Sequence, residues 1–258
     1  MIEYAQNPVN SAHSPGMIDL DLLESLSGCQ SVEELHAATA RITKLLGFEH
    51  FLYAVRVNLS LTRPYEFVLS GYPKAWRNHY TEAGYANIDP TVLHCGRDRR
   101  VTPLIWSGQA FHDMPVAKLR AEAKDFGLAS GASFPVQGKN GEVAMLSLAT
   151  PRAHRHAKRD ILETLGRAQL LACYLHEAIQ RVVLTKEVLP LQKIRLTDRE
   201  RECLLWAAEG KTSWEIAHII HTSERTVTFH LQNVTRKMGV STRQHAVARA
   251  LSLGLVSP

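Results

Sequence analysis

Long apolar runs and paired cysteines are both absent from this sequence, and each absence excludes a class of protein. No stretch approaches the roughly 18 consecutive apolar residues that a membrane-spanning helix needs. The N-terminal residues contain no basic segment followed by an apolar one, so we expect no signal peptide and a cytoplasmic location. The cysteines lie far apart and lack metal or redox spacing, so we expect four reduced thiols at Cys29, Cys95, Cys173 and Cys203.

The net charge is also small, and its position along the sequence is more informative than its total. The 258 residues are 45% hydrophobic and 21% charged, as in an ordinary globular protein, and the net charge is +5. Residues 190–258 hold ten Lys and Arg against six Asp and Glu, which is +4, so residues 1–189 carry only +1. Because the excess lies at the C-terminal end, we expect that part to bind a polyanion.

Residues 17–182 alternate helix and strand signals, after an Asn-, Ser- and Pro-rich arm over residues 1–16. Serine and proline starts with glycine stops predict helices, and aromatic and β-branched runs predict strands. The predicted helices are 31–46, 73–84, one beginning at Pro90, 115–127 and 157–182, and the predicted strands are 48–59, 65–69, 132–136 and 142–149, the last two forming a hairpin. This order favours an α+β domain, an α-β-α sandwich around an antiparallel sheet. Residues 183–193 are predicted to be a linker.

Residues 194–258 contain start and stop signals for four helices. The starts are capping boxes at 197–200, 212–215 and 241–244 with an N-cap at Ser223, and the stops are Gly210, Gly239 and Gly254. Only residues 221–223 separate the second helix from the third. That tight connection is typical of a helix-turn-helix, so we predict a C-terminal all-α, four-helix domain.

The third of these helices has one apolar face and one hydrogen-bonding or cationic face. Val227, Leu231, Val234 and Met238 share the apolar face, and the opposite face has no carboxylate. A merely solvated face would mix both signs of charge, whereas a phosphate-lined groove would repel a carboxylate. We therefore predict a surface that binds double-stranded DNA, with Arg225, Thr228 and Gln232 reading bases, Lys211, Thr226, Arg236 and Lys237 holding phosphates, and Thr212 and His230 beside them.

A longer signature runs through the same region. It comprises Leu196-Thr197-x-Arg199-Glu200-x-x-x-Leu204, Gly210-Lys211-Thr212, Glu215-Ile216-Ala217, Ser223-Glu224-x-Thr226-Val227-x-x-His230 and Lys237-x-Gly239-Val240. This signature resembles the DNA-binding domain of LuxR-type regulators, and Glu200, Leu204 and Gly210 fall on its most typical positions. Because such domains also follow phosphoreceiver domains and large ATPases, this resemblance alone leaves the stimulus open.

A second signature precedes it in the chain. It comprises Tyr72-Pro73-x-x-Trp76-Arg77-x-x-Tyr80, Asp89-Pro90-Thr91, Trp106 and Gly131. It is similar to the acyl-homoserine-lactone-binding domain of quorum-sensing receptors, and the two resemblances cover nearly the whole chain after residue 16. The chain is thus identified as a member of the LuxR-type quorum-sensing receptors. The resemblance implies control of transcription by a homodimer on pseudo-palindromic DNA, with RNA polymerase as a further partner.

The residues of the second signature have the chemistry that such a ligand needs. Tyr72, Trp76 and Tyr80 share one helical face, although an ordinary aromatic core stripe has the same spacing. Asp89 lies in a sparsely charged stretch, and a buried carboxylate is costly unless it accepts hydrogen bonds. The resemblance implies the following contacts: Asp89 with the ligand amide, Trp76 with the lactone carbonyl, Tyr72 and Ser147 with the acyl carbonyl, Tyr80, Trp106 and Val143 as walls, and Thr91 and Arg77 behind them. The lactone is an effector, and no cofactor is expected.

An enzyme that opens lactones is one alternative. The sequence has no G-x-S-x-G nucleophile elbow. His154, His156 and Asp160 lack metallo-lactonase spacing, and we interpret their basic, turn-like segment as a solvated loop. We therefore expect neither enzyme activity nor a bound metal.

Two regulators of other kinds are the remaining alternatives. A phosphorylation-driven response regulator would need a βαβ pattern with acidic residues at strand ends, which residues 1–189 do not show. An unpaired receptor that senses a different small molecule remains open, although Tyr72, Trp76 and Asp89 together argue against it.

Overall fold

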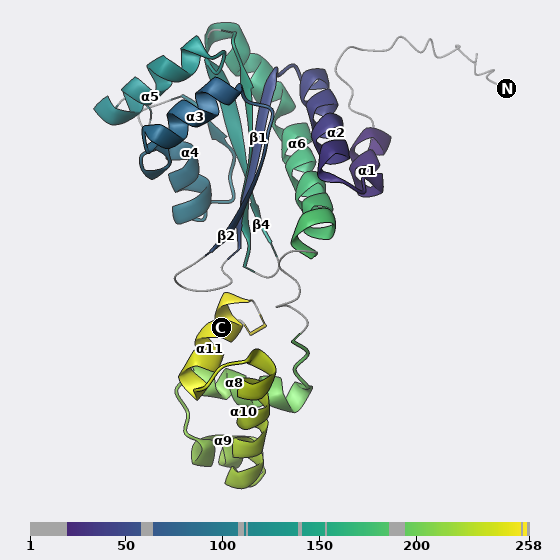
Figure 1. Ribbon diagram of the computed structural model, residues 1–258, viewed down its shortest axis with the longest axis vertical. Coiled ribbons are helices and arrows are strands. Elements are labelled where there is room, and N and C mark those ends of the chain that lie inside the picture. The colour runs from purple at the N-terminus through teal and green to yellow at the C-terminus, as the bar shows by residue number, and fades with distance from the viewer. Residues whose placement is uncertain are drawn as a thin grey trace, which may run out of the picture.

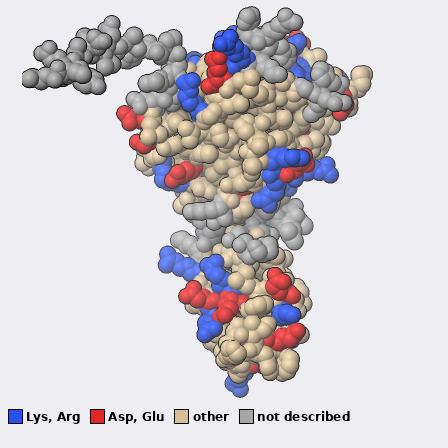
Figure 2. Space-filling view, turned by 180° about the vertical axis from the view of Figure 1, so that it is seen from behind, with Lys and Arg blue, Asp and Glu red and all other residues tan. Residues whose placement is uncertain are grey.

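The chain forms two units, each with its own hydrophobic core (Figure 1). The computed structural model describes residues 20–57, 64–107, 111, 113–138, 141–152, 154–185, 194–253 and 255–256, without the side chains of residues 154–158 and 252. Within those residues, no helix is both long enough and apolar enough to cross a membrane. Figure 2 shows charged side chains at the edges of the larger unit and a wide uncharged area across its middle.

An antiparallel sheet of five strands is the framework of the larger unit, in the order β2-β1-β5-β4-β3. The strands are β1 (His50–Val57), β2 (Tyr65–Ser70), β3 (Leu104–Ile105), β4 (Ser130–Gln137) and β5 (Val143–Thr150). The central strand β5 pairs Ser147 with Leu52 of β1 on one side and with Ser133 of β4 on the other. This register places two serine hydroxyls side by side in the middle of the sheet.

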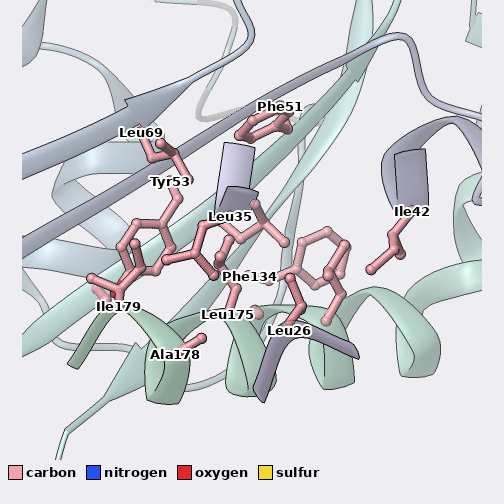
Figure 3. Packing of buried hydrophobic residues seen from close by; sticks show 14 of the residues in the cluster. Leu26, Leu35, Ile42, Phe51, Tyr53, Leu69, Phe134, Leu175, Ala178 and Ile179 are labelled. Atoms are coloured by element: carbon pink, nitrogen blue, oxygen red, sulfur yellow. The ribbon is translucent and has the colours of Figure 1, made fainter. Parts of the chain in front are cut away.

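The main core lies between the sheet and three helices: α1 (Leu20–Gly28), α2 (Val32–Leu45) and α6 (His154–Ile179), which continues into the π-helical turn η4 (Gln180–Leu184). Alternate strand residues point into it because successive side chains of a strand face opposite ways. Figure 3 shows Phe51, Tyr53 and Phe134 from the sheet packed against Leu175 and Ile179 of α6. These side chains are almost completely buried.

The other face of the sheet carries a smaller and less complete core. It is covered by α3 (Lys74–Glu82), the 3-10 turn η1 (Tyr85–Asn87), α4 (Pro90–Val92), the π-helical turn η2 (Leu93–Arg97) and α5 (Met114–Asp125) (Figure 1). Six buried residues form its centre: Trp76, Tyr85, Leu119, Ala123, Leu128 and Ala149. Several aromatic side chains around them are only partly buried. Helices therefore cover both faces of an antiparallel sheet, which confirms the predicted α-β-α sandwich.

The smaller unit is a bundle of four helices, as predicted: α8 (Asp198–Ala208), α9 (Ser213–Ile219), α10 (Glu224–Met238) and α11 (Arg243–Ser252). Both halves of the capping box are present at Thr197 and at Thr212, and Ser223 caps α10. His221 turns the chain between α9 and α10 with φ of +52°, a left-handed conformation that is uncommon outside glycine.

Three local predictions need correction, and one strand was not predicted. The capping serine predicted for α11 is wrong, because Thr242 accepts the hydrogen bond from His245 N instead of Ser241. The loop predicted around residues 154–156 is wrong, because α6 begins at His154. Helical geometry also extends to Leu184, inside the predicted linker. Strand β3 was not predicted, since two residues carry no periodicity. Gly254 and residues 1–16 lie outside the described residues.

Candidate ligand site and candidate DNA-binding surface

A chain of hydroxyl and indole groups crosses the sheet on the face that α3, α4 and α5 cover. Ser147 of β5 and Ser133 of β4 have their Oγ atoms 2.7 Å apart. The indole Nε1–H of Trp106 donates to Ser133 Oγ over 3.0 Å. Either serine can be the donor within the pair, so Ser147 can offer a donor or an acceptor to a molecule beside it.

Trp106 depends on a glycine for its place against β4. A Cβ on Gly131 would lie 2.8 Å from the Trp106 ring and would overlap Leu148 O. Only a residue without a side chain allows this close approach. On the other side, the Arg120 guanidinium of α5 donates to Trp106 O over 2.8 Å. The structure thus explains why Gly131 belongs to the sequence signature.

Tyr72 presents a buried hydroxyl group that lacks a partner. Among the described residues, no group makes a well-aligned hydrogen bond with its Oη. Burial raises the pKa of Tyr72 and the charge of Asp89 raises it further, while the nearby Ser147 hydroxyl lowers it. Leaving a buried hydroxyl without a partner costs about 1–3 kcal/mol. A ligand oxygen beside Tyr72 and Ser147 would remove that cost.

Asp89 is an anchored acceptor at the same site. It is the N-cap of α4, and its Oδ1 accepts hydrogen bonds of 2.8 Å from both the Thr91 N–H and the Thr91 hydroxyl. Its Oδ2 accepts a 2.9 Å hydrogen bond from the Tyr80 hydroxyl. Burial raises the pKa of Asp89, and the bonds from Thr91 and Tyr80 oppose that rise. Because a carboxylate has about four acceptor sites, Asp89 can accept a further bond from a ligand N–H.

Trp76 lies at the centre of the aromatic cluster and is 3% exposed. Its ring centroid is 5.4 Å from that of Phe126, 5.9 Å from that of Tyr80 and 6.3 Å from that of Tyr85. Its indole N–H donates to none of the residues that the structure describes. An indole N–H is a donor only, so Trp76 offers a second open position at this site, for a ligand acceptor.

Contacts bring seven of the eight predicted ligand residues together at one place: Tyr72, Trp76, Tyr80, Asp89, Thr91, Trp106 and Ser147. The eighth, Val143, points to the same side of β5 but lies four residues from Ser147 along the strand. Arg77 is exposed, in agreement with the alternative that placed it on the surface.

Glu122 of α5 supports the aromatic cluster and was missed by sequence analysis. Its carboxylate accepts a short hydrogen bond from the Tyr85 hydroxyl and is 2.7 Å from His79 Nε2. The bond from Tyr85 and then that from His79 lower the pKa of Glu122, while the bond to Glu122 raises the pKa of Tyr85 to about 12. Both partners contact Trp76, so Glu122 positions the rings around the open indole N–H.

The apolar face of α10 is buried as predicted, and the opposite face is open. Val227, Leu231, Val234 and Met238 pack in the cores of the smaller unit. All three predicted base-reading residues and two of the four predicted phosphate contacts are exposed: Arg225, Thr228, Gln232, Arg236 and Lys237. Among the described residues, the Arg236 guanidinium bonds within its own helix, to Asn233 Oδ1 at 2.9 Å.

Several of the predicted DNA contacts already have partners inside the unit. Lys237 Nζ donates to Glu200 Oε2 over 2.6 Å and to Arg195 O over 3.1 Å. Although burial opposes it, the bonds from Lys237 and from the Thr197 N–H hold the pKa of the buried Glu200 below its usual range.

Hydroxyl groups at two helix starts are also engaged. The hydroxyl of Thr226 bonds to Ser223 Oγ at 2.8 Å, and that of Thr212 donates to Glu215 Oε2 over 2.9 Å. Lys211 Nζ is 3.9 Å from Glu215, and His230 is half-buried.

The described residues do not meet the requirements of a metal site. They contain no group of three or more His, Cys, Asp or Glu that could hold a metal ion. The side chains of His154 and His156 lie outside the described residues.

Comparison with known proteins identifies both units. A family model described as "Autoinducer binding domain" matches residues 31–179, and one described as "Bacterial regulatory proteins, luxR family" matches residues 195–250. The transcriptional activator protein AnoR of Acinetobacter nosocomialis is 34% identical over 241 residues, 92% of this chain and 98% of AnoR. The transcriptional activator protein VanR of Vibrio anguillarum is 32% identical over 240 residues, 93% of this chain and 98% of VanR.

Solved structures agree with these relatives. Escherichia coli SdiA matches with a TM-score of 0.71 and 25% identity, over 93% of this chain and 98% of SdiA. SdiA in complex with octanoyl-rac-glycerol matches with a TM-score of 0.70 and 26% identity, over 92% of this chain and 94% of that one.

The fold, the site and these matches define a transcription regulator with a small-molecule-binding unit in front of a helix-turn-helix. The chain belongs to the LuxR family of regulators that carry an autoinducer-binding domain. This confirms the family predicted from the two sequence signatures. The matched families and relatives are regulators, which also confirms the prediction that the chain is not an enzyme.

Proposed function

We propose that this protein is a cytoplasmic quorum-sensing receptor that binds an N-acyl-homoserine lactone and, as a homodimer, binds pseudo-palindromic promoter DNA. The observation that carries the proposal is the buried Tyr72 hydroxyl, which has no well-aligned partner among the described residues and lies beside Ser147 and close to an anchored acceptor, Asp89. A ligand with one amide N–H and two carbonyls complements such a set of groups. We place the two units at residues 17–185 and 194–258, joined by a linker that begins after the helical turn η4.

The polar part of the ligand is assigned by donor and acceptor chemistry. The amide N–H donates to Asp89, and Tyr72 with Ser147 donates to the acyl carbonyl. The Trp76 N–H donates to the lactone carbonyl. Tyr80 and Thr91 hold Asp89 in place through their hydroxyl groups, and Trp106 fixes Ser133 and forms an apolar wall.

The acyl chain has an apolar surface to cover beyond Ser147. The same side of the sheet continues with Met145 and Val143 of β5, and with Ala54 of β1, which pairs with both Met145 and Val68 of β2. Val68 is 55% exposed, although it is apolar. A chain of methylene groups lying on these residues would bury it, and burial of each methylene contributes about 0.8 kcal/mol.

Ligand binding and DNA binding are coupled through stability in this proposal. A ligand present at 1,000 times its dissociation constant adds about 4 kcal/mol to the folded state. That is a large share of a typical stability of about 5–15 kcal/mol. The stabilised chain forms a homodimer, which places two copies of α10 about one DNA turn apart.

On DNA, we assign base reading to Arg225, Thr228 and Gln232, and phosphate contacts to Arg236 and Lys211. Lys237 stays on Glu200 and Thr212 in its capping box, so we assign both to holding the unit together. Thr226 and His230 flank the reading surface. RNA polymerase is the expected further partner of the bound dimer.

The test is to isolate the full-length chain from cells supplied with N-octanoyl- or N-dodecanoyl-homoserine lactone and to extract its ligand for mass spectrometry. We expect about one lactone per chain and a higher melting temperature than that of the ligand-free chain. If neither lactone is retained or stabilises the chain, the lactone assignment is wrong. The alternative is a receptor for a different acylated molecule, since SdiA is known in complex with octanoyl-rac-glycerol. Octanoyl-rac-glycerol is therefore included as a competitor, and its preferential retention would favour that alternative.

A further inference from the structure

Phe229 is an aromatic residue in an unexpected place, on the open face of α10. Its side chain is 57% exposed, although phenylalanine is usually buried. With 3.6 residues per turn, Phe229 lies roughly 170° around the helix axis from the centre of the buried stripe. No residue of α10 is therefore directed further from the core of the unit.

The neighbours of Phe229 on this face are the residues assigned to base reading. Arg225 lies one turn before it and Gln232 one turn after it, and both are exposed. The only described aromatic ring near it belongs to the adjacent His230, with centroids 5.7 Å apart. The ring thus stands in the middle of a polar surface, and the protein that the structure describes leaves more than half of it uncovered.

A DNA major groove offers one apolar group to such a ring. Each A·T pair presents the C5-methyl group of thymine in the groove, and no other base carries an apolar group there. Arg225 and Gln232 are seven residues apart, which is about 10 Å along the helix, or about three base-pair steps. Phe229 lies between them on the helix and therefore faces base edges within the same three base-pair steps.

We propose that Phe229 reads thymine in each half-site through the C5-methyl group. The inference rests on the proposed function, because it requires α10 to enter the major groove. It adds a specificity-determining residue of a different chemistry: Arg225, Thr228 and Gln232 read hydrogen bonds, whereas Phe229 reads an apolar contact. Half-sites selected by this protein therefore contain a thymine at one position between those that Arg225 and Gln232 contact.

The experiment first selects duplexes from a randomised library with the full-length chain in the presence of N-octanoyl- or N-dodecanoyl-homoserine lactone. In the most enriched duplex, each thymine is then replaced singly by uracil, which lacks only the methyl group. We expect one uracil position in each half-site to weaken binding about fourfold, the effect of one buried group of methylene size. The other positions should change little.

Variants assign the effect to the ring. Phe229→Ala should bind the thymine and uracil duplexes equally, and Phe229→Leu should keep part of the preference because its side chain remains apolar. Leu251→Ala on α11, which also truncates an exposed apolar side chain, should keep the whole uracil effect. Because Phe229 and Leu251 are both exposed, all three variants should have the melting temperature of the parent.

Two results would overturn the proposal: the parent ignores uracil at every position, or Phe229→Ala keeps the same uracil penalty. Both differ from failure of the proposed function itself, in which no duplex is enriched and no sequence preference exists to be altered.

Discussion

Two tyrosines with buried hydroxyl groups lie on opposite sides of the same sheet, and those hydroxyl groups differ in one respect. Tyr53 points into the main core, where its hydroxyl is 2.7 Å from His176 Nδ1 of α6. Tyr72 lies beside the smaller core, where its hydroxyl is buried and has no well-aligned partner among the described residues. The Tyr53 hydroxyl is thus paired within the protein, whereas the Tyr72 hydroxyl is left for a second molecule to complete.

Other side chains on the two faces of the sheet also differ in how completely they are buried. On the main-core side, sheet and helix side chains such as Phe51, Phe134 and Leu175 are at most 1% exposed. On the other side, Trp76 has an open N–H and the apolar Val68 is 55% exposed. Buried polar groups in folded proteins are nearly always paired, so the unpaired Tyr72 hydroxyl, which lies beside Ser147 and Asp89, is a position that a ligand would complete.

The largest effect is expected from changing Asp89, the acceptor proposed for the ligand N–H. Asp89→Asn keeps an oxygen for Thr91 but loses the carboxylate charge. We expect lactone affinity to fall about 10- to 100-fold, because hydrogen bonds to charged groups contribute about 1.5–3 kcal/mol. Isothermal titration with the two lactones measures it. The matched control is Asp125→Asn, at the exposed end of α5, which should bind normally. Equal affinity of both variants would remove Asp89 from the site.

Two neighbouring basic residues extend the comparison to the smaller unit: Lys237 bonds to the buried Glu200 of another helix, whereas Arg236 bonds to Asn233 of its own helix. Lys237→Met leaves the buried Glu200 without its cation and should lower the free energy of unfolding of this unit by about 1–3 kcal/mol. Arg236→Met should leave stability unchanged and, because the proposed homodimer carries two copies of Arg236, reduce the slope of log affinity against log salt by about 1.8.

Denaturant unfolding and DNA titration at several salt concentrations check both outcomes. If Lys237→Met instead reduces the salt slope without loss of stability, the original assignment of Lys237 to a phosphate was correct and the structural role is wrong.

Removal of each tyrosine hydroxyl tests the two sides of the sheet directly, because the two changes in the stability of the ligand-free protein should have opposite signs. Tyr53→Phe loses a hydrogen bond and should destabilise the ligand-free protein by about 1 kcal/mol. Tyr72→Phe removes an unpaired buried hydroxyl and should stabilise the ligand-free protein by a similar amount, about 1 kcal/mol. Only the second should weaken lactone binding. Melting curves with and without lactone measure both effects, and a destabilised Tyr72→Phe variant would show that its hydroxyl is satisfied within the protein.

The sequence predicted those features that short stretches of chain decide. The capping boxes at Thr197 and Thr212 need only residues three positions apart, and both are formed. Ser241 failed because Thr242, its neighbour, has the same capping chemistry.

Contacts between distant segments escaped sequence analysis. Ser133 meets Ser147 only through the β4–β5 register, and Glu122 meets Tyr85 across 37 positions. Nothing in α5 distinguishes Glu122 from an ordinary solvated residue. Lys237 has the composition of a phosphate contact, and its bond to Glu200 depends on how α10 packs on α8. Composition indicated which side chains are available, and packing decided which of them remain free.

The smallest expected effect concerns Glu122, a satisfied group on the less complete side of the sheet. Its pKa is held below the usual value of 4.5 by the bonds from Tyr85 and His79. A depressed folded-state pKa stabilises the protein above the ordinary value, and that contribution is lost as pH falls through the depressed value. Glu122→Gln should therefore melt slightly below the parent at pH 7, and the two melting temperatures should converge as the pH falls below 4.5. Glu82→Gln, on the exposed end of α3, should follow the parent at every pH. A constant difference between Glu122→Gln and the parent across this range would mean that the carboxylate charge contributes nothing to holding the aromatic cluster.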